Sequence, residues 1–371
     1  MLTRLVLAAL LAAAALAHAQ TQNYPAKSIR IVLPLAEGGL DASSEQGSRL
    51  RDANVRESAA ATWMIAQATI SREQYPTRAI RIILPFAPGG GADIIARILG
   101  QKMTDSWGQQ VVVDNRAGAS GNIGAEIVAK SAPDGYTLLI TSSALAINPS
   151  VFRSVPYDLN RDFAPITQPG LLPNILVVHP SLPVKTVKDL IVLARSQPGK
   201  LAYASAGAGT GTHLAAEMFK LLAGIDMVHV PYKGGGALIS DLLGGQVALT
   251  FATLPSVMPY VKVGRLRAVA MTTTKRWPGL PAVPTIAESG FPGFEMSTWI
   301  GLLAPAGTPK DVIGKLHQEV VRILHLSDVR ERFDGLGIEP VGDTPEQFAQ
   351  YIKSELVKYA KVVKQSGARA E

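Results

Sequence analysis

The sequence predicts an α/β protein with parallel-dominated sheets flanked by helices. Its 371 residues are 47% hydrophobic and 18% charged, so the chain can bury enough apolar surface to fold as a globular protein. Short runs rich in β-branched residues alternate with runs of helical period, and glycine and serine fill the junctions. Strands separated by crossover helices of this length lie parallel. At about 150 residues per domain, the length suggests two domains.

The first nineteen residues have the pattern of a secretory signal peptide. Arg4 precedes an apolar run over 5–16, and Ala17 and Ala19 are the small residues that a signal peptidase recognises. The run is too short to span a membrane, which takes about 20 apolar residues. A buried N-terminal helix is the alternative, but nothing amphipathic accompanies the run. We therefore expect cleavage near Ala19 and export of the mature chain.

A stretch that follows the predicted signal peptide is repeated later in the chain. Residues 24–40 reappear as 75–91, with ten of the seventeen positions identical. The second copy continues into a run of helical period at 92–103. The first copy continues into 41–56, which is rich in Ser, Glu, Arg and Asp and lacks a sustained apolar face. We therefore expect residues 20–74 to be a partial duplication and a flexible linker outside the ligand-binding lobes.

From Tyr75 onward, predicted strands and helices alternate. The expected strands lie at 80–84, 111–113, 137–140, 201–204 and 227–230. The expected helices lie at 92–103, 123–130, 214–222 and 237–243. Ligands of parallel α/β sheets bind at the carboxyl ends of the strands, which is where the glycine- and serine-rich junctions fall.

These junctions offer hydrogen-bond donors to an anion. The first four N–H groups of a helix lack internal partners, and the helix dipole adds a partial positive charge there. A strand-to-helix turn made of small residues therefore presents convergent N–H groups and hydroxyls to an anionic oxygen. Ordinary α/β turns also use glycine, but four or five such turns favour a shared site for a small anionic or polar ligand.

Several function classes are excluded or disfavoured. The chain has no cysteine, which excludes a thiol nucleophile, a cysteine-ligated zinc and an iron–sulfur site. No glycine-rich loop is followed by Lys and Ser/Thr, so a P-loop is absent, and no H-E-x-x-H or G-x-S-x-G motif occurs. The net charge of +7 is spread thinly, without the basic run that nucleic-acid binding needs. We expect no cofactor, no metal and no nucleic-acid partner.

Two ionisable residues at the junctions have alternative roles. His213 would be the general base of a secreted hydrolase, but a histidine at a helix start more often hydrogen-bonds the preceding loop. Asp93 would bind an ammonium group, but an acid in a first helical turn more often stabilises the helix dipole or acts as a cap.

The junctions resemble one known family in detail. The segments are PFAPGGGAD at 85–93, NRAGASGN at 115–122, PDGYT at 133–137, ASAGAGTGTH at 204–213, VPYKG at 230–234 and PAVPTIAE at 281–288. In this order and spacing they resemble the substrate-binding proteins of tripartite tricarboxylate transporters, the Bug family. The resemblance implies a periplasmic, two-lobed type II binding protein of the Venus-flytrap kind. It also implies capture of a small carboxylate, held partly through ordered water, and delivery to the membrane components of the transporter.

The resemblance assigns ligand-binding residues position by position. They are Phe86, Ala87, Gly90, Asp93, Ser120, Gly121, Asn122, Ser142, Ser143, Asn148, Ser205, Gly207, Thr210, His213, Tyr232 and Lys233. Of these, Phe86 is expected to form a hydrophobic wall, and Lys233 is either a ligand contact or a solvated loop lysine. Trp299 is expected in the core rather than at the site.

The resemblance also implies two lobes that close like a hinge. We expect lobe 1 at 75–176 with 296–371 and lobe 2 at 177–295, with crossings near 175–178 and 296–298. We expect a monomer and no enzymatic activity. A periplasmic sensor or partner-binding module with the same pocket is the alternative function, and a secreted hydrolase is the weakest one.

Overall fold

The computed structural model describes residues 75–369, so the predicted signal peptide and the duplicated stretch 20–74 lie outside the described residues. Within 75–369, ten strands form a mixed sheet in the order β2-β1-β3-β9-β4-β7-β5-β6, and β8 and β10 also pair with β4. The strands are β1 (Ile80–Leu84), β2 (Val111–Asn115), β3 (Thr137–Ser142), β4 (Phe163–Val178), β5 (Ala202–Ser205), β6 (Val228–Pro231), β7 (Leu249–Thr253), β8 (Arg267–Met271), β9 (Ser297–Pro305) and β10 (Glu339–Pro340).

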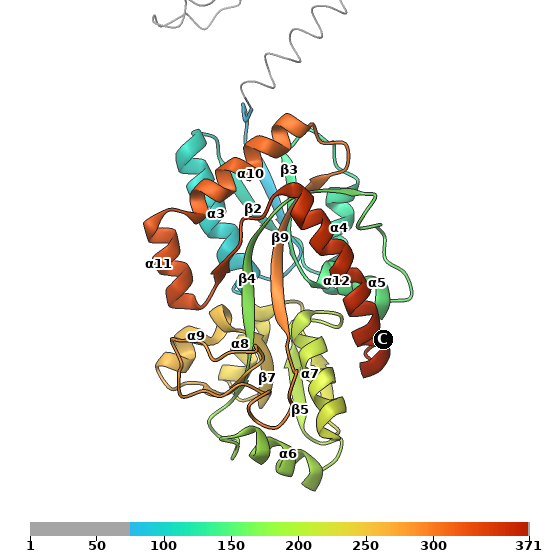
Figure 1. Cartoon of the computed structure of the whole chain (residues 1–371), viewed down its shortest axis with the longest axis vertical. Helices are drawn as coiled ribbons and strands as arrows, with labels where there is room; N and C mark the ends of the chain where they lie inside the picture. The colour runs from blue at the N-terminus through green and yellow to red at the C-terminus, as the bar shows by residue number, and fades with distance from the viewer. Residues whose placement is uncertain (1–74, 370–371) are drawn as a thin grey trace, which may run out of the picture. The chain divides into compact units, whose positions relative to one another are not determined.

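Helices connect these strands and cover the sheet (Figure 1). They are α3 (Gly91–Trp107), the short 3₁₀ helix η2 (Ala119–Gly121), α4 (Asn122–Ala129), α5 (Ala144–Val151), α6 (Val187–Ser196), α7 (Gly211–Ala223), α8 (Gly235–Leu243), α9 (Leu254–Lys262), α10 (Lys310–Leu324), α11 (Ser327–Leu336) and α12 (Pro345–Ser366). Each strand and helix predicted from the sequence between 80 and 243 is present, with ends shifted by at most a few residues. The α/β prediction is therefore confirmed.

The sheet has two halves that share strand β4. In the first half, β2, β1 and β3 are parallel, and β9 joins β3 to the first part of β4 through antiparallel pairing that ends at Pro173 and Ser297. From Asn174 onward, β4 pairs instead with β7 and β8, and β7, β5 and β6 form the parallel second half. Strands β4 and β9 run side by side through the middle of the molecule (Figure 1). Two stretches of extended chain thus connect the halves.

Burial explains why these segments form strands and helices. Strand β1 has four fully buried residues out of five, as expected for a central strand covered on both faces. Helix α3 ends at Gly108, whose φ of +65° is the left-handed conformation that a glycine adopts without strain. Helix α12 begins with a capping box between Thr344 and Gln347. Trp299 is 0% exposed and packs edge-on against Phe348, so its predicted core position is confirmed.

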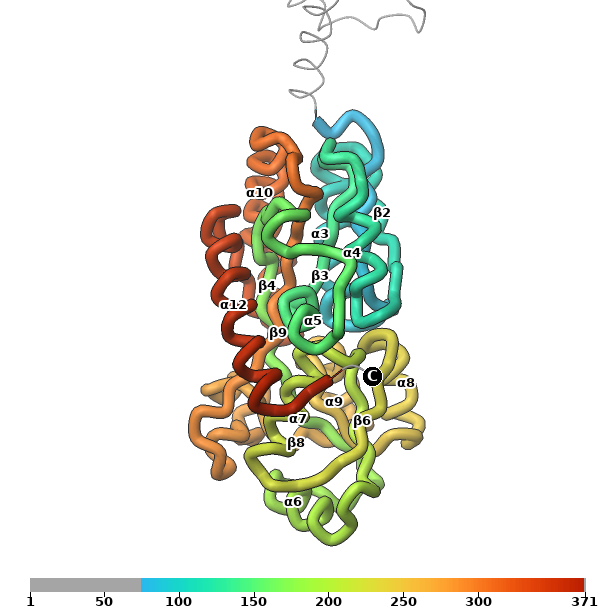
Figure 2. Tube along the Cα trace, turned by 90° about the vertical axis from the view of Figure 1, so that its right-hand side faces the viewer, coloured from blue at the N-terminus to red at the C-terminus, as the bar shows by residue number. Residues whose placement is uncertain are grey.

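Helix α12 lies against both halves of the sheet. It packs against α5 and β4 in the first half and against α7 in the second, and its C-terminal end lies near α7 and β6 in Figure 2. One hydrophobic cluster accordingly contains Phe348 and Tyr359 of α12 together with Tyr203 of β5 and Phe219 of α7. The core is therefore continuous from one half to the other.

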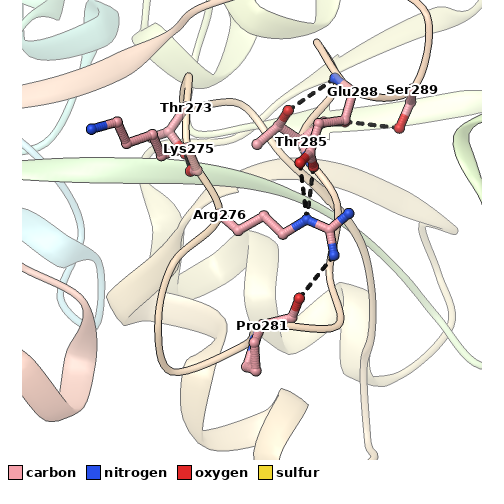
Figure 3. Close-up of polar contacts among 7 residues, drawn as sticks. All are labelled: Thr273, Lys275, Arg276, Pro281, Thr285, Glu288 and Ser289. Atoms are coloured by element: carbon pink, nitrogen blue, oxygen red, sulfur yellow. Dashed lines mark hydrogen bonds and ion pairs between the residues drawn. The ribbon is translucent and has the colours of Figure 1, made fainter.

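The long connection between β8 and β9 is held by one arginine–glutamate pair. Arg276 donates from Nε to both carboxylate oxygens of Glu288, at 3.1 and 2.8 Å, and from Nη1 to the carbonyl of Pro281 at 2.9 Å (Figure 3). Glu288 also accepts from the N–H of Thr285 at 2.7 Å, and Thr285 Oγ1 accepts from the N–H of Glu288 at 3.0 Å. These hydrogen bonds thus hold the segment 281–288, which contributes to the family resemblance, in a fixed loop. None of its residues lines the two cavities between the halves of the sheet.

Candidate functional site

Two cavities lie where the halves of the sheet meet. The first, of about 60 Å³, is bordered by the starts of α3 and α7 and by β3, β4, β7, β9 and α8. The second, of about 700 Å³, is bordered by the loops after β1, β2, β5 and β6 and by the end of the chain at 367–369. Phe86 and Ala206 line both cavities and therefore stand at the boundary between them.

The loop after β1 carries the first group of predicted site residues. It leads through Phe86 and Ala87 to Gly90, which has extended backbone and no side-chain cap, and α3 then begins at Gly91. A Cβ on Gly91 would lie 2.6 Å from Leu172 and 2.8 Å from Thr253 Oγ1, so only glycine allows the helix to start this close to the sheet. The first N–H groups of α3 therefore lie at the edge of the first cavity.

Asp93 is buried in the first turn of α3 and holds this loop together. Its Oδ2 accepts from the N–H of Gly89 at 3.1 Å and from Arg97 Nε at 2.9 Å, and its Oδ1 accepts from Asn115 Nδ2 at 3.2 Å. Burial opposes ionisation, but the hydrogen bonds from Arg97, Gly89 and Asn115 outweigh it and lower the pKa of Asp93. Asp93 is thus an ionised structural residue, as its position in the first helical turn predicts.

The loop after β2 faces the second cavity. Ala119 and Ser120 have φ of +44° and +53°, a left-handed conformation uncommon for residues other than glycine. Asn148 of α5 fixes this turn by donating to the carbonyl of Ser120 at 3.0 Å and to Asn122 Oδ1 at 2.7 Å. Ser120 and Gly121 line the cavity, whereas the side chains of Asn122 and Asn148 hold the loop from behind.

The loop between β5 and α7 supplies the second helix start. Thr210 caps α7, since its side chain accepts from the N–H of His213, and Thr210 and Thr212 line the first cavity. His213 Nδ1 accepts from the N–H of Gly209 at 3.1 Å. The loop-bonding role predicted for His213 is therefore confirmed.

His213 also stacks on His229 behind this loop. Their ring centroids are 4.1 Å apart with an interplanar angle of 18°, and the Oγ of Ser205 lies 2.6 Å from Nε2 of His229. Burial, with a further contribution from the charge of Lys220, lowers the pKa of His213 to about 4. Burial and the neighbouring His213 lower the pKa of His229 to about 3. Both rings are therefore neutral at physiological pH.

The loops of the two halves touch across the cavities. The N–H of Ala87 donates to the carbonyl of Lys233 at 3.0 Å, and a Cβ on Gly90 would lie 3.5 Å from the backbone of Gly235. A Cβ on Gly236 would lie only 1.8 Å from the carbonyl oxygen of Pro88. Glycines at both loops therefore permit a close backbone approach that encloses the space between them.

The remaining predicted site residues do not all line the same cavity. Tyr232 and the exposed Lys233 line the second cavity, and Tyr232 donates from its hydroxyl to Asp241 at 2.7 Å. Burial, followed by that hydrogen bond, raises the pKa of Tyr232 to about 12. Ser142 lines the first cavity and its Oγ accepts from the N–H of Ala144 at 3.3 Å, whereas Ser143 is fully buried behind it.

The structure sorts the predicted residues into three groups. Those lining the first cavity are Phe86, Ala87, Gly90, Asp93, Ser142 and Thr210. Those lining the second are Phe86, Ser120, Gly121, Gly207, His213, Tyr232 and Lys233. Those lining neither are Asn122, Ser143, Asn148 and Ser205.

Sequence reasoning missed the part of the first cavity that comes from β4, β7, β9, α8 and α9. These residues are Leu172, Leu238, Ile239, Ala252, Thr253, Ser256, Thr298 and Ile300. Most are apolar and follow strand or helix periodicity, so their pattern is the same as that of core residues. The available signals were partial: Thr298 lies in a predicted crossing, and Leu238 and Ile239 follow the glycine-rich junction at 234–236.

Residues 75–369 contain neither a metal-binding cluster nor a membrane-spanning helix. No group of three or more His, Asp or Glu residues is placed to hold a metal ion in this part of the chain. None of the helices described between these residues is both long and apolar enough to cross a membrane.

An α/β fold of two sheet halves, joined by extended strands and enclosing cavities at helix starts, defines a solute-binding protein of the periplasmic type. The family described as the tripartite tricarboxylate transporter family receptor matches residues 95–368. The chain belongs to this family of solute-binding receptors, whose members are periplasmic binding proteins.

Two curated relatives extend the match over most of their length. The protein in the tcbD-tcbE intergenic region of Pseudomonas sp. (strain P51) is 42% identical over 292 residues, which is 78% of this chain and 87% of the relative. Protein BugT of Bordetella pertussis is 41% identical over 304 residues, which is 81% of this chain and 93% of the relative.

Two similar solved structures are of proteins with a ligand. Rpa4515 of R. palustris with adipate is 38% identical, with a TM-score of 0.78 over 80% of this chain and 99% of that one. MatC of Rhodopseudomonas palustris with bound malate is 31% identical, with a TM-score of 0.75 over 78% of this chain and 100% of that one. Both ligands are small carboxylates.

Proposed function

We propose that this chain is a periplasmic receptor that captures a small carboxylate and delivers it to the membrane components of a tripartite tricarboxylate-type transporter. Membership of the receptor family supports this function, as do the adipate and malate described for two similar structures. The observation that carries the proposal is the meeting of two helix starts, α3 and α7, at one cavity from opposite halves of the sheet. Such an arrangement surrounds one carboxylate with N–H donors and partial positive charge.

Capture is proposed to involve closure of two lobes, 75–176 with 296–371 and 177–295. The lobes open by bending where β4 changes partners after Pro173 and where the chain enters β9 at Ser297. The hydrogen bond between Ala87 and Lys233 then forms only when the loops meet. A ligand that contacts both helix starts binds the closed form better than the open form, and so shifts the population toward it.

Export is part of the proposal. The apolar run at 5–16 with Ala17 and Ala19 supports cleavage near Ala19 by a signal peptidase. N-terminal sequencing of the protein recovered from the periplasm tests this step, and an uncleaved N-terminus would contradict it.

A thermal-shift screen over small carboxylates tests ligand capture. A ligand present at 100 times its Kd adds about 2.7 kcal/mol to the free energy of unfolding, so a binding carboxylate raises the Tm measurably. We expect the ligand to be recovered chemically unchanged after prolonged incubation with the pure protein. No stabilisation by any carboxylate would overturn the proposal, and recovery of an altered ligand would indicate an enzyme.

A transport assay separates the receptor from a sensor that uses the same pocket. Cells lacking the gene are expected to lose uptake of the radiolabelled ligand, and the plasmid-borne gene is expected to restore it. Normal uptake together with a lost transcriptional response to the ligand would assign the protein to sensing.

A further inference from the structure

The first cavity has an apolar wall, of which the sequence predicted only Phe86. Six side chains from both halves form it, each less than a tenth exposed: Phe86, Leu172, Leu238, Ile239, Ala252 and Ile300. They come from the loop after β1, from β4, β7 and β9, and from α8, so the wall is complete only when the two halves are together. A ligand group that enters this cavity exchanges water for hydrocarbon contacts.

No basic side chain accompanies this wall. Among residues 75–369, no Lys or Arg side chain lines the first cavity, and its one ionisable lining residue is Asp93. Asp93 already accepts from Arg97, Gly89 and Asn115, so its negative charge is balanced within the protein. A second ligand carboxylate placed against this wall, away from the two helix starts, would lose its hydration without meeting a counter-charge.

Three of the hydroxyl groups that line the cavity already donate hydrogen bonds within the protein. Thr253 donates to Ser256 Oγ at 3.2 Å, and Ser256 donates to the carbonyl of Thr253 at 2.7 Å. Thr298 donates to Asn174 Oδ1 at 3.1 Å. What the cavity offers an anion is therefore the N–H groups at the starts of α3 and α7, together with the hydroxyl of Ser142, whose Oγ accepts from the N–H of Ala144 and keeps its own proton for a ligand. These donors border one small cavity and suit a single carboxylate.

We infer that the receptor selects a carboxylate with one anionic group and an apolar body, held with its carboxylate at the two helix starts and its hydrocarbon part against this wall. The inference rests on the proposed receptor function and names the class of ligand within it. Leu172, Leu238 and Ile239 are then the residues that determine specificity. A hydroxyl, amino or second carboxyl group at the far end of the ligand is rejected because the wall leaves it unpaired.

The cavity size sets a limit on chain length. At about 30 Å³ per water-sized group, a cavity of about 60 Å³ takes about two methylene or methyl groups. Each buried methylene is expected to tighten binding about fourfold. Affinity should therefore rise over the first members of a series of linear monocarboxylates and then stop rising.

Calorimetric titration of the mature protein with matched pairs tests the inference. Acetate, propanoate and butanoate form the chain-length series; propanoate is compared with malonate and 3-hydroxypropanoate, and butanoate with succinate. We expect each monocarboxylate to bind at least tenfold more tightly than its dicarboxylate or hydroxylated counterpart. If the dicarboxylates bind as tightly or more tightly, the receptor function stands and the inference is overturned. If no carboxylate binds, the proposed function itself fails.

Two serine variants test whether the apolar wall causes the selectivity for monocarboxylates. Leu238→Ser places a hydroxyl in the wall and is expected to weaken monocarboxylate binding at least tenfold, while Leu238→Met retains it. Leu222→Ser is the matched control, because Leu222 is 54% exposed on α7 and lines neither cavity. Unchanged affinity in a folded Leu238→Ser protein would overturn the assignment. If that variant lacks a cooperative melt, the ligand series on the unmodified protein decides alone.

Discussion

Replacing Gly236 by alanine should prevent the loops of the two halves from meeting. The added Cβ would lie 1.8 Å from the carbonyl oxygen of Pro88, where an ordinary carbon–oxygen contact is about 3.3 Å. The loops must therefore separate by roughly 1.5 Å, which breaks the hydrogen bond from Ala87 to Lys233, worth about 0.5–1.5 kcal/mol. Relieving the clash elsewhere costs about 1–3 kcal/mol. Together these effects destabilise the closed form by about 1.5–4.5 kcal/mol and weaken ligand binding roughly 10- to 2,000-fold.

Calorimetry gives the Kd, and small-angle scattering gives the radius of gyration with and without ligand. We expect Gly236→Ala to melt cooperatively, to bind weakly and to show no ligand-induced compaction. Gly314→Ala is the control, because Gly314 lies in α10 with open space around it. It should bind normally and gain up to about 1 kcal/mol of stability from the better helix former. A Gly236→Ala protein with the unmodified Kd would refute the closure argument.

Three further perturbations concern stability. Because the pKa of His213 falls to about 4 on folding, the unfolded chain binds its proton first as pH drops below 6.5. The protonation of His213 should therefore lower the free energy of unfolding by about 1.4 kcal/mol per pH unit down to about pH 4, and His229, whose pKa also falls on folding, adds to this slope. His213→Gln should reduce the slope measured in urea melts without abolishing it, and an unchanged slope would show that other groups cause the pH dependence. Ser205→Ala leaves His229 Nε2 without its partner and should cost about 1–3 kcal/mol while ligand affinity is retained, which calorimetry checks. A chain beginning at Glu73 keeps the bond from Tyr75 to the Gly135 carbonyl and should match the full chain in Tm and Kd; loss of a cooperative melt would show that residues before 73 are required.

The elements that were predicted well are those with a local signal. Strand β1 was predicted at its observed bounds because its apolar run is bounded by turn residues. The helix starts at Gly91 and Gly211 were placed to within three residues from the glycine-rich junctions before them. The same chemistry predicted the loop-bonding role of His213.

Features that depend on distant parts of the chain could not be predicted. The antiparallel pairing of β9 with both β3 and β4 makes the sheet mixed, and it joins residues more than a hundred positions apart. Leu238 and Ile239 have the same spacing as any buried helix face, so only the fold reveals that they border a cavity. Ser205 resembled a ligand contact, but its Oγ lies 2.6 Å from a histidine nitrogen that the sequence places 24 residues later.

The way the chain crosses between the halves has a consequence for how such receptors diversify. Everything from the end of β4 at Val178 to the start of β9 at Ser297 is one uninterrupted stretch inserted between two neighbouring strands. Two recombination points would therefore exchange the whole second half, with Leu238, Ile239 and Ala252, between related genes. Phe86, Leu172 and Ile300 would remain behind. New ligand preferences could thus arise by combining one part of the apolar wall with a new second half, without passing through a series of point mutations that each disturb the core.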